Sequence, residues 1–277
     1  MRRLSEDHVD DTPTRLTRDG IRLYDRADFP AMHKAGQVAA DILDRVAPLV
    51  EPGQSTAAID KAVEAMIAQA GVTSATIGYK GYQHATCISI NHVVCHGIPG
   101  EKRLRDGDIL NIDVTVIVDG WFGDTSRMYV AGRLPRRAER LIQVTHDALF
   151  KGIEAVRPGR TFGDIGHAIQ AYVEAHRMSV VRDFCGHGVG RVFHAPPNVL
   201  HYGRPGTGPV LEEGMIFTIE PMVNLGRPET KVLADDWTAV TRDKSLSAQF
   251  EHSIGVTADG CEIFTLSPAG KFHPTWE

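Results

Sequence analysis

Apolar residues recur at intervals of three or four from Met32 onward, which is the spacing of one buried helix face. A second helix is expected to begin at Ser55 or Thr56, either of which can cap it, and to stop at Gly71. The same spacing predicts two further helices, near residues 138–156 and 162–177. The helices therefore fall into two successive pairs.

Short runs rich in apolar residues lie between and after these helices, and they predict strands. The runs cover residues 87–90, 109–118, 127–130, 215–223 and 252–256. Helices followed by strands in each half of the chain predict an α+β fold, in which helices back an antiparallel sheet.

One of these runs, residues 109–118, alternates between apolar and polar side chains. One face of the strand should pack on helices, while the other, which carries Asp113, should form the floor of a polar cleft. The Asp119-Gly120 pair that follows is typical of a tight hairpin turn. Such a hairpin could bring Asp113 beside Asp124, although Asp124 alone would fit a turn or a helix cap equally well.

Two strand-like segments look like copies of each other. LRDGDILNID at residues 104–113 and LEEGMIFTIE at residues 211–220 align at a constant offset of 107, and each ends in an acid, Asp113 or Glu220. Both runs are too apolar for loops, and an unpaired buried carboxylate is strongly disfavoured. Acids at equivalent ends of two buried strands therefore indicate a bound cation near a pseudo-twofold axis.

The duplication extends to the preceding helices. PGQSTAAIDKAVEAMI at residues 52–67 resembles PGRTFGDIGHAIQAYV at residues 158–173, at an offset of 106. This period is too long for a solenoid array. We therefore expect two similar halves that close over one site.

Composition and charge limit the class of protein. The 277 residues can bury a large core, and 30 basic against 35 acidic residues leave no footprint for a specific nucleic acid. Four cysteines without CxxC spacing favour the reducing cytoplasm, and the sequence shows neither a signal-peptide core nor a membrane span. Residues 1–20 are charged and bury little, which predicts a disordered or loosely packed tail before a single domain over residues 21–277.

A glycine-rich segment, CGHGVGRVFH, carries His187 and His194. Its glycine spacing does not match a dinucleotide fingerprint, and two prolines follow where a helix would have to begin. A lone histidine is more often structural than a ligand, but His187 occurs in a chain that already carries paired buried acids. Glu251, in AQFEHSIGV just before a predicted strand, says little by itself.

Four carboxylates and one imidazole would together suit two divalent cations, because the four negative charges offset those of both ions. The candidate ligands are Asp113, Asp124, His187, Glu220 and Glu251. Such oxygen-rich sites hold Co, Mn, Fe, Zn or Ni, and the affinity order of these metals does not decide between them. Two metals about 3.5–4 Å apart typically activate a water and polarise a carbonyl or phosphoryl group. The HExxH, GxSxG and P-loop motifs are absent from the sequence.

The sequence resembles the bacterial type I methionine aminopeptidases of metallopeptidase family M24. The resemblance covers about residues 21 to 270 and rests on the motifs CISINHVVCHGIPG, GDILNIDVTVIVDGWFGDTSRM, GHGVGRVFH, IEPMV and SLSAQFEHSI. It implies the pita-bread fold, with two pseudo-symmetric halves and a curved antiparallel sheet backed by helices. It also implies removal of the N-terminal methionine from nascent proteins with a small second residue, by a metal-bridging hydroxide at a dinuclear site.

The resemblance assigns each candidate ligand a place. Asp113 would chelate the first ion and His187 and Glu220 the second, while Asp124 and Glu251 would bridge both.

Other site residues are also implied by the resemblance. His96 would contact the scissile amide, His194 would bind the carbonyl oxygen and stabilise the tetrahedral intermediate, and Glu220 would also shuttle a proton. The methionine pocket falls on Tyr79, Tyr82, Cys87, Phe193 and Trp237. Thr76 would lie at the pocket mouth, where many relatives carry cysteine, so Cys87 is expected to be the only pocket thiol. A sodium or potassium ion would bind at Asn91, Val93 and Ser247.

The family further implies a cytoplasmic monomer, with docking on the ribosome left open. Two alternatives remain: a non-catalytic binding module of this fold, and a related Xaa-Pro-type aminopeptidase. The complete ligand set, with His96 and His194, argues against the first. The short N-terminus argues against the second, and only 25 residues between His194 and Glu220 leave no room for the insertion of type II enzymes.

Overall fold

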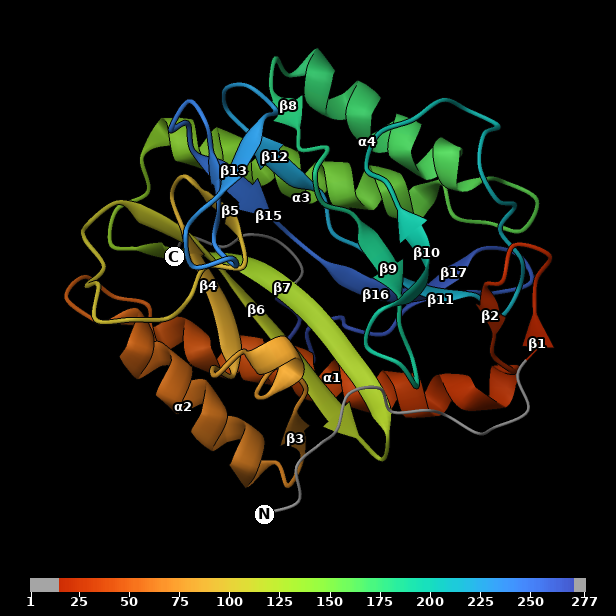
Figure 1. Cartoon of the computed structure of the whole chain (residues 1–277), viewed down its shortest axis with the longest axis horizontal. Coiled ribbons are helices and arrows are strands. Elements are labelled where there is room, and N and C mark those ends of the chain that lie inside the picture. Colours follow the sequence, from red (N-terminus) through yellow and green to blue (C-terminus); the bar gives the residue numbers. More distant parts are fainter. Residues whose placement is uncertain (1–14, 272–277) are drawn as a thin grey trace.

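The computed structural model describes residues 15–271. Antiparallel strands lie between two pairs of helices, one pair on each side (Figure 1). The pairs are α1 (Phe29–Val46) with α2 (Thr56–Gln69), and α3 (Arg136–Glu154) with α4 (Phe162–Ala175). The short 3-10 helices are η1 (Arg26–Asp28), η2 (Ala47–Leu49) and η3 (Tyr79–Gly81). Within residues 15–271, no helix is long and apolar enough to cross a membrane.

The four predicted helices are all present, close to their expected ends. Ser55 caps α2 as predicted, because its Oγ accepts a hydrogen bond from the Ala58 amide at 3.2 Å. The first helix begins at Phe29, before Met32, because Pro30 stands in its first turn, where a missing N–H breaks no hydrogen bond.

The N-terminal half is built on one long hairpin of β6 (Asp108–Val118) and β7 (Trp121–Ala131), which pair without a break. The Asp119-Gly120 turn between them has φ values of 51° and 80°, and two positive values suit a tight hairpin turn. The predicted hairpin is therefore confirmed. The strand predicted at 127–130 is longer than expected, because polar residues 124–126 are buried in the sheet and break the apolar pattern.

The other strands of this half are short. Their bounds are β1 (Arg15–Leu16), β2 (Arg22–Leu23), β3 (Thr73–Ser74), β4 (Thr86–Ile90) and β5 (Val93–Cys95). Both β3 and β4 pair with β6, whereas β1 and β2 form a separate two-stranded sheet. Of the predicted tail, residues 1–14 lie outside the described residues, so its disorder and the domain boundary at residue 20 stay predictions.

The strands of the C-terminal half are shorter and form several sheets. Their bounds are β8 (Ser179–Val180), β9 (Gly186–Gly188), β10 (Ala195–Val199), β11 (Ile216–Ile219), β12 (Met222–Asn224), β13 (Thr230–Val232), β14 (Ala239–Thr241), β15 (Ser247–Gln249), β16 (His252–Val256) and β17 (Cys261–Ile263). One sheet has the order β10-β9-β11-β16-β17, and two others have the orders β15-β12-β8 and β13-β14-β5.

The single strand predicted over residues 215–223 is wrong, because β11 ends at Ile219 and β12 begins at Met222. Pro221 between them has no N–H to donate to a strand ladder. The chain therefore leaves one sheet, in which β11 pairs with β9 and β16, and enters another, in which β12 pairs with β8 and β15. Glu220 consequently stands at a strand end.

The segments that repeat in the sequence adopt the same local structure. The Gly53 amide donates to the Leu104 carbonyl at 2.8 Å, and the equivalent Gly159 amide donates to the Leu211 carbonyl at 3.0 Å. The sequence repeat therefore corresponds to a repeat in space, as the prediction of two similar halves requires.

The turn before each acid-bearing strand requires a glycine. Gly107 and Gly214, which align in the repeat, have φ values of 89° and 93°. Side chains rarely adopt this left-handed conformation, whereas glycine adopts it freely. Each turn leads directly into the strand that delivers a carboxylate to the site.

The two faces of β6 have different environments, as the alternation predicts. Leu110, Ile112 and Val114 are fully buried in the same apolar cluster as Met32 of α1. Asp113 lies on the opposite face, where it lines a cavity between the halves. Burial of one face thus fixes which residues the other face presents.

Candidate active site

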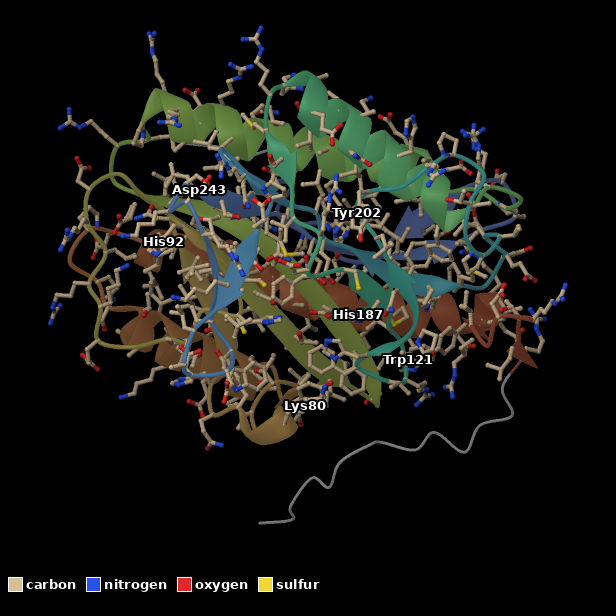
Figure 2. The ribbon with its side chains drawn as sticks, turned by 45° about the horizontal axis from the view of Figure 1, so that its top comes forward. Lys80, His92, Trp121, His187, Tyr202 and Asp243 are labelled. Carbon is tan, nitrogen blue, oxygen red and sulfur yellow. The ribbon has the colours of Figure 1, made fainter. Side chains whose placement is uncertain are left out.

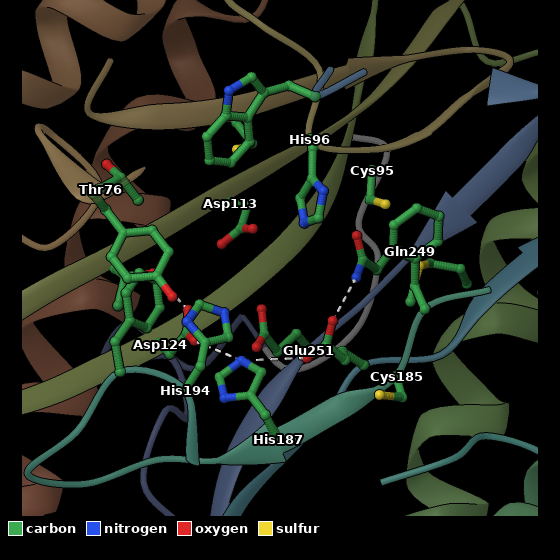
Figure 3. Close-up of a pocket in the computed structure, with 18 of the residues that line it drawn as sticks. Thr76, Cys95, His96, Asp113, Asp124, Cys185, His187, His194, Gln249 and Glu251 are labelled. Atoms are coloured by element: carbon green, nitrogen blue, oxygen red, sulfur yellow. Dashed lines mark hydrogen bonds and ion pairs between the residues drawn. The ribbon is translucent and has the colours of Figure 1, made fainter. Parts of the chain in front are cut away.

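A cavity of about 610 Å³ lies between the two halves and is lined by residues of both. All five candidate ligands line it: Asp113, Asp124, His187, Glu220 and Glu251. Figure 3 shows the labelled side chains converging on this space from several strands and loops. Residues that lie far apart in the sequence therefore meet at one place.

The hairpin supplies the first two carboxylates. Asp113 stands opposite Ser126 and Thr115 opposite Asp124 in the β6–β7 register, which brings both acids to the same face. The Thr115 hydroxyl donates to Asp124 Oδ1 at 2.7 Å and fixes that carboxylate. The predicted proximity of Asp113 and Asp124 is confirmed.

His187 on β9 joins these acids from the other half. Its Nε2 lies 3.5 Å from Asp124 Oδ2 and 3.7 Å from Glu220 Oε1. Its Nδ1 lies 3.1 Å from the Gly188 carbonyl oxygen, which can only accept, so the proton belongs on Nδ1. The lone pair on Nε2 therefore faces the carboxylates, as a metal-ligating histidine requires.

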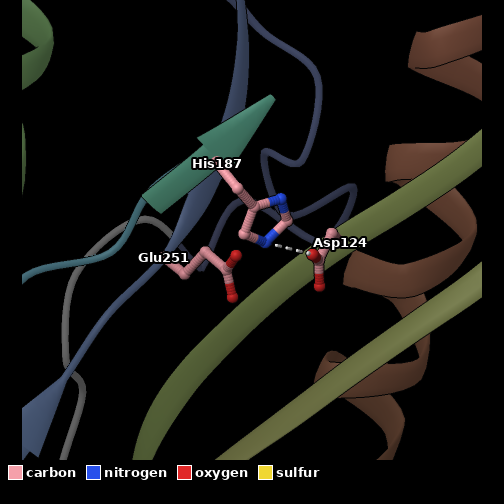
Figure 4. A group of neighbouring side chains, drawn as sticks. All are labelled: Asp124, His187 and Glu251. Atoms are coloured by element: carbon pink, nitrogen blue, oxygen red, sulfur yellow. Dashed lines mark ion pairs between the residues drawn. The ribbon is translucent and has the colours of Figure 1, made fainter. Parts of the chain in front are cut away.

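Glu251 lies directly before β16 and connects the two halves. Its amide donates to the Ser126 carbonyl at 3.1 Å, and the Thr125 hydroxyl donates to its carbonyl at 2.7 Å. The ligand atoms of Asp124, His187 and Glu251 all lie within 4.8 Å of one another (Figure 4). These three side chains form the tightest group of the set.

The electrostatics of the cluster call for a cation. Asp113 Oδ1 is buried and has no hydrogen-bond partner among residues 15–271. Burial, and then repulsion by neighbouring carboxylates, raises the pKa of Asp113, Glu220 and Glu251 well above the usual range. Divalent ions would remove both penalties, so the residues present fit the metal centre that the sequence predicts.

Glu220 is held in place by neighbours that the sequence analysis missed. The Thr218 hydroxyl donates to Oε1 at 2.8 Å, and Gln249 Nε2 donates to Oε2 at 3.2 Å. The Glu220 amide donates to His201 Nε2 at 3.0 Å. Thr218 and Gln249 each precede a ligand by two positions, and side chains two apart share a strand face. That spacing was the signal for them.

The two predicted catalytic histidines lie on different walls. The His194 ring lies 4.1 Å from that of His187 and stacks on Tyr79 at 5.3 Å. The His96 ring makes an edge contact with Trp237 at 6.2 Å. Surrounding groups that exclude water lower the pKa of both His96 and His194, and His187 lowers it further. Each ring therefore stays neutral at pH 7 and keeps one N–H to donate.

All of the residues assigned to the methionine pocket line the cavity: Thr76, Tyr79, Tyr82, Cys87, Phe193 and Trp237. Tyr79 packs against Phe193 at 4.9 Å, and Tyr82 packs against Trp237 at 4.8 Å. Cys87 on β4 stands opposite Asp113 in the strand register. The apolar wall thus adjoins the carboxylate cluster.

Two details of the pocket refine the expectation. Cys95 and Cys185 line the cavity too, so the cavity holds three thiols, while the expectation that Cys87 is the only thiol of the methionine pocket stays a prediction. Cys95 lies on β5, which pairs with β14, and Cys185 directly precedes β9, so sequence spacing could not reveal that both reach the cavity. The Thr76 hydroxyl donates to the His84 carbonyl at 2.8 Å, which fixes this side chain. Burial, and then the nearby Asp113, raises the pKa of the Cys87 thiol, which stays protonated.

The structure brings together part of the predicted monovalent-cation site. The Ser247 amide donates to the Asn91 carbonyl at 2.8 Å. Asn91 has a positive φ of 55°, and its side-chain amide donates to Asp108 Oδ1 at 2.7 Å. Val93 follows on β5, opposite Val240. Cation binding at these residues stays a prediction.

Residues 30–258 match metallopeptidase family M24. The match spans both helix pairs and all five candidate ligands. The chain therefore belongs to metallopeptidase family M24, a family that uses divalent metal ions.

Within that family, the chain is similar to bacterial methionine aminopeptidases. It is 55% identical to the methionine aminopeptidase of Rickettsia prowazekii (strain Madrid E) over 257 residues, which cover 92% of this chain and 99% of that protein. It is 51% identical to the methionine aminopeptidase of Escherichia coli (strain K12) over 241 residues, or 86% and 91% of the two proteins. The crystal structure of methionine aminopeptidase from Rickettsia prowazekii superposes with a TM-score of 0.88 at 56% identity, covering 89% of this chain and 100% of that chain. The predicted resemblance and the pita-bread fold are confirmed.

Proposed function

We propose that this protein is a cytoplasmic methionine aminopeptidase that removes the N-terminal methionine from nascent proteins with a small second residue. One observation carries the proposal: a cluster of carboxylates and histidine adjoins an aromatic pocket within a single cavity. The cluster suits hydrolysis of an amide, and the pocket suits one unbranched apolar side chain. The names of the similar proteins support the same activity.

The cluster would hold two divalent ions, because four carboxylates carry the charge that balances them. Asp113 would bind one ion, His187 and Glu220 the other, and Asp124 and Glu251 both. When bound, such ions lower the pKa of a shared water and polarise the scissile carbonyl. The donor set accepts Co, Mn, Fe, Zn or Ni, and metal analysis of the purified protein would identify the physiological one.

The remaining roles belong to three protein groups. His194, neutral beside His187, would donate its N–H to the carbonyl oxygen as negative charge develops there. His96 on the opposite wall would donate to the amide of the scissile bond. Glu220, oriented by Thr218 and Gln249, would accept a proton and return it to the leaving amine.

The aromatic wall would select methionine. A thioether sulfur is polarizable and gains from contact with ring edges, and its straight chain enters a narrow space between Tyr79, Tyr82, Phe193 and Trp237. Cys87 would close the pocket beside Asp113. The monovalent cation at Asn91, Val93 and Ser247, the monomeric state and docking on the ribosome rest on the resemblance alone.

The proposal is tested by methionine release from Met-Ala-Ser and Met-Leu-Ser peptides with protein of assayed metal content. We expect release from the first only, and loss of release after chelation. His194→Ala should lose about 10²–10³-fold in kcat while retaining its metal, as expected for a donor aimed at developing charge. Full activity without metal, or no release from Met-Ala-Ser by metal-loaded protein, would contradict the proposal.

The same assay separates the alternatives. A Xaa-Pro-type aminopeptidase would release alanine from Ala-Pro-Ala in preference to methionine from Met-Ala-Ser. A binding module would retain metal and release nothing from either peptide. The presence of His96 and His194 beside a complete ligand set favours catalysis over a binding module.

A further inference from the structure

Lys80 stands at the outer end of an aromatic stack that leads to the carboxylate cluster. Its Nζ lies 5.3 Å from the centre of the Tyr79 ring, and that ring stacks on His194 at 5.3 Å. His194 in turn lies 4.1 Å from His187. Lys80 is exposed, yet it lines the same cavity. Figure 2 shows it on η3, near the edge of the molecule.

The backbone around Lys80 forms a tight turn. Gly78, Lys80 and Gly81 have φ values of 89°, 45° and 84°. The Gly78 amide donates to the Tyr82 carbonyl at 2.7 Å, and the Tyr82 amide donates to the Tyr79 carbonyl at 2.9 Å. A lysine is uncommon in a left-handed conformation, where glycine, asparagine or aspartate is easier. The turn keeps the ammonium beside the cavity wall.

The charge of Lys80 is not matched by the protein. Among residues 15–271 it forms no ion pair, and it is the only lysine or arginine of the cavity lining. Asp183 is the one acid of the lining outside the candidate ligands, and its Oδ2 already accepts from the Thr230 amide and hydroxyl. Once metal ions balance the ligand carboxylates, Lys80 is a free positive charge beside the path of the substrate.

We propose that Lys80 forms a subsite for an acidic side chain at the third residue of the substrate. The inference rests on the proposed function, which places the scissile bond beside His194. Tyr79 contacts both Phe193 of the methionine pocket and His194, so we place the outgoing peptide along the outer side of this stack. An extended peptide advances roughly 3.3 Å per residue, so a side chain two residues beyond the methionine would come level with Lys80. The second residue is small, which makes the third the first side chain long enough to reach the ammonium.

The test compares kcat/KM for three peptide amides, Met-Ala-Asp-Gly, Met-Ala-Asn-Gly and Met-Ala-Lys-Gly, with metal-loaded protein. Amidation removes the terminal carboxylate, which would otherwise bind the same ammonium. Exposed ion pairs typically change an equilibrium by about 1.4-fold to 5-fold, so we expect an Asp/Asn preference in that range and a larger Asp/Lys preference. High salt should shrink both preferences by screening.

Two variants isolate the charge from the fold of the turn. Lys80→Asn and Lys80→Asp both suit a left-handed backbone and differ from each other only in charge. Lys80→Asn should bring the Asp/Lys ratio close to one, and Lys80→Asp should reverse it. Lys151→Gln, which removes an exposed lysine from the outer helix α3, is the matched control and should keep the wild-type ratio.

The outcomes distinguish this inference from the proposed function. If wild type releases methionine from all three peptides at the same rate, or if Lys80→Asp keeps the wild-type ratio, the subsite is wrong while the proposed function stands. A preference that appears only when the aspartate occupies the fourth position overturns the assignment to the third. If metal-loaded wild type releases no methionine from any peptide, the proposed function has failed.

Discussion

Asp113 and Glu220 occupy the same place in the repeat, one in each half, yet the protein holds them differently. Asp113 lies within an unbroken strand between β4 and β7, and its Oδ1 has no hydrogen-bond partner among the described residues. Glu220 lies at a strand end before Pro221, and both of its oxygens accept hydrogen bonds. Where the backbone is rigid, the carboxylate is left free for an ion; where the strand breaks, side chains orient it.

The halves also contribute different parts of the site. The N-terminal half supplies Tyr79, Tyr82 and Cys87 of the proposed methionine pocket together with His96, whereas the C-terminal half supplies Phe193 and Trp237 of that pocket together with His187 and His194. Metal binding draws on both. Changes in either half should therefore affect selectivity or turnover, according to the residue changed.

The largest effect should come from Asp113→Asn, which removes a carboxylate that the protein itself does not satisfy. We expect loss of bound metal and a fall of about 10³-fold or more in kcat/KM. The ion would lose both a ligand and a negative charge that balances its own charge. Metal content by elemental analysis and methionine release measure it. Asp183→Asn, which neutralises another acid of the cavity lining, is the control and should keep its metal. Normal metal content in Asp113→Asn would contradict the view that the unpaired carboxylate of Asp113 serves to bind metal.

Thr218→Val should have an intermediate effect, because it removes the hydroxyl that orients Glu220 while keeping the shape of the side chain. Loss of such a supporting hydrogen bond typically costs about 10–100-fold in metal affinity or activity. Thr218→Ser keeps the hydroxyl and should restore most of the affinity. Titration of metal-free protein with Mn²⁺ measures both variants. Equal affinities for Val and Ser would show that Glu220 needs no side-chain support.

In metal-free protein, Asp113→Asn should stabilise the fold instead of harming the protein. Burial and repulsion raise the folded-state pKa of Asp113, so its contribution to stability is full below the unfolded pKa near 4 and is lost as pH rises toward the folded value. The variant should therefore match wild type near pH 4 and have the higher melting temperature at pH 8. Melting curves in chelator at several pH values test this. A difference that is independent of pH would mean that charge at Asp113 is not the cause.

Cys87→Ala should have the smallest effect and should leave the metals in place. Enlarging the pocket wall should relax the preference for methionine over leucine by no more than the ~1–3 kcal/mol that one methylene is typically worth in such pockets. The ratio of kcat/KM for Met-Ala-Ser and Leu-Ala-Ser measures it, with Cys261→Ala, outside the cavity lining, as the control. An unchanged ratio would place Cys87 outside the pocket.

Much of the framework could be predicted because it depends on local patterns. The apolar spacing of the helices, the Ser55 cap and the Asp119-Gly120 turn are each encoded within a few residues. The sequence repeat indicated that the chain has two similar halves. Alternation along β6 also placed Asp113 on the polar face. These features were confirmed because neighbouring residues alone decide them.

The features that were missed depend on residues far apart in the chain. The break at Pro221 sends two halves of one apolar run into different sheets, and no local signal states which sheets those are. Cys95 reaches the cavity through the pairing of β5 with the distant β14, and Cys185 reaches it from the segment before β9. Lys80 carries no motif, and its importance emerges only from the stack between Tyr79 and His194. Contacts between residues far apart in the chain could therefore not be predicted from the sequence.

The contact between Ser126 and Glu251 has a consequence for how the molecule is assembled. The β6–β7 hairpin closes between neighbours and should form early, whereas the strand after Glu251 joins it across 125 residues of chain, and such distant contacts form slowly. A growing chain therefore presents Asp113 and Asp124 long before the other ligands exist. Each new molecule can bring the full set of candidate ligands together only in one late step, after Glu251 has been synthesised.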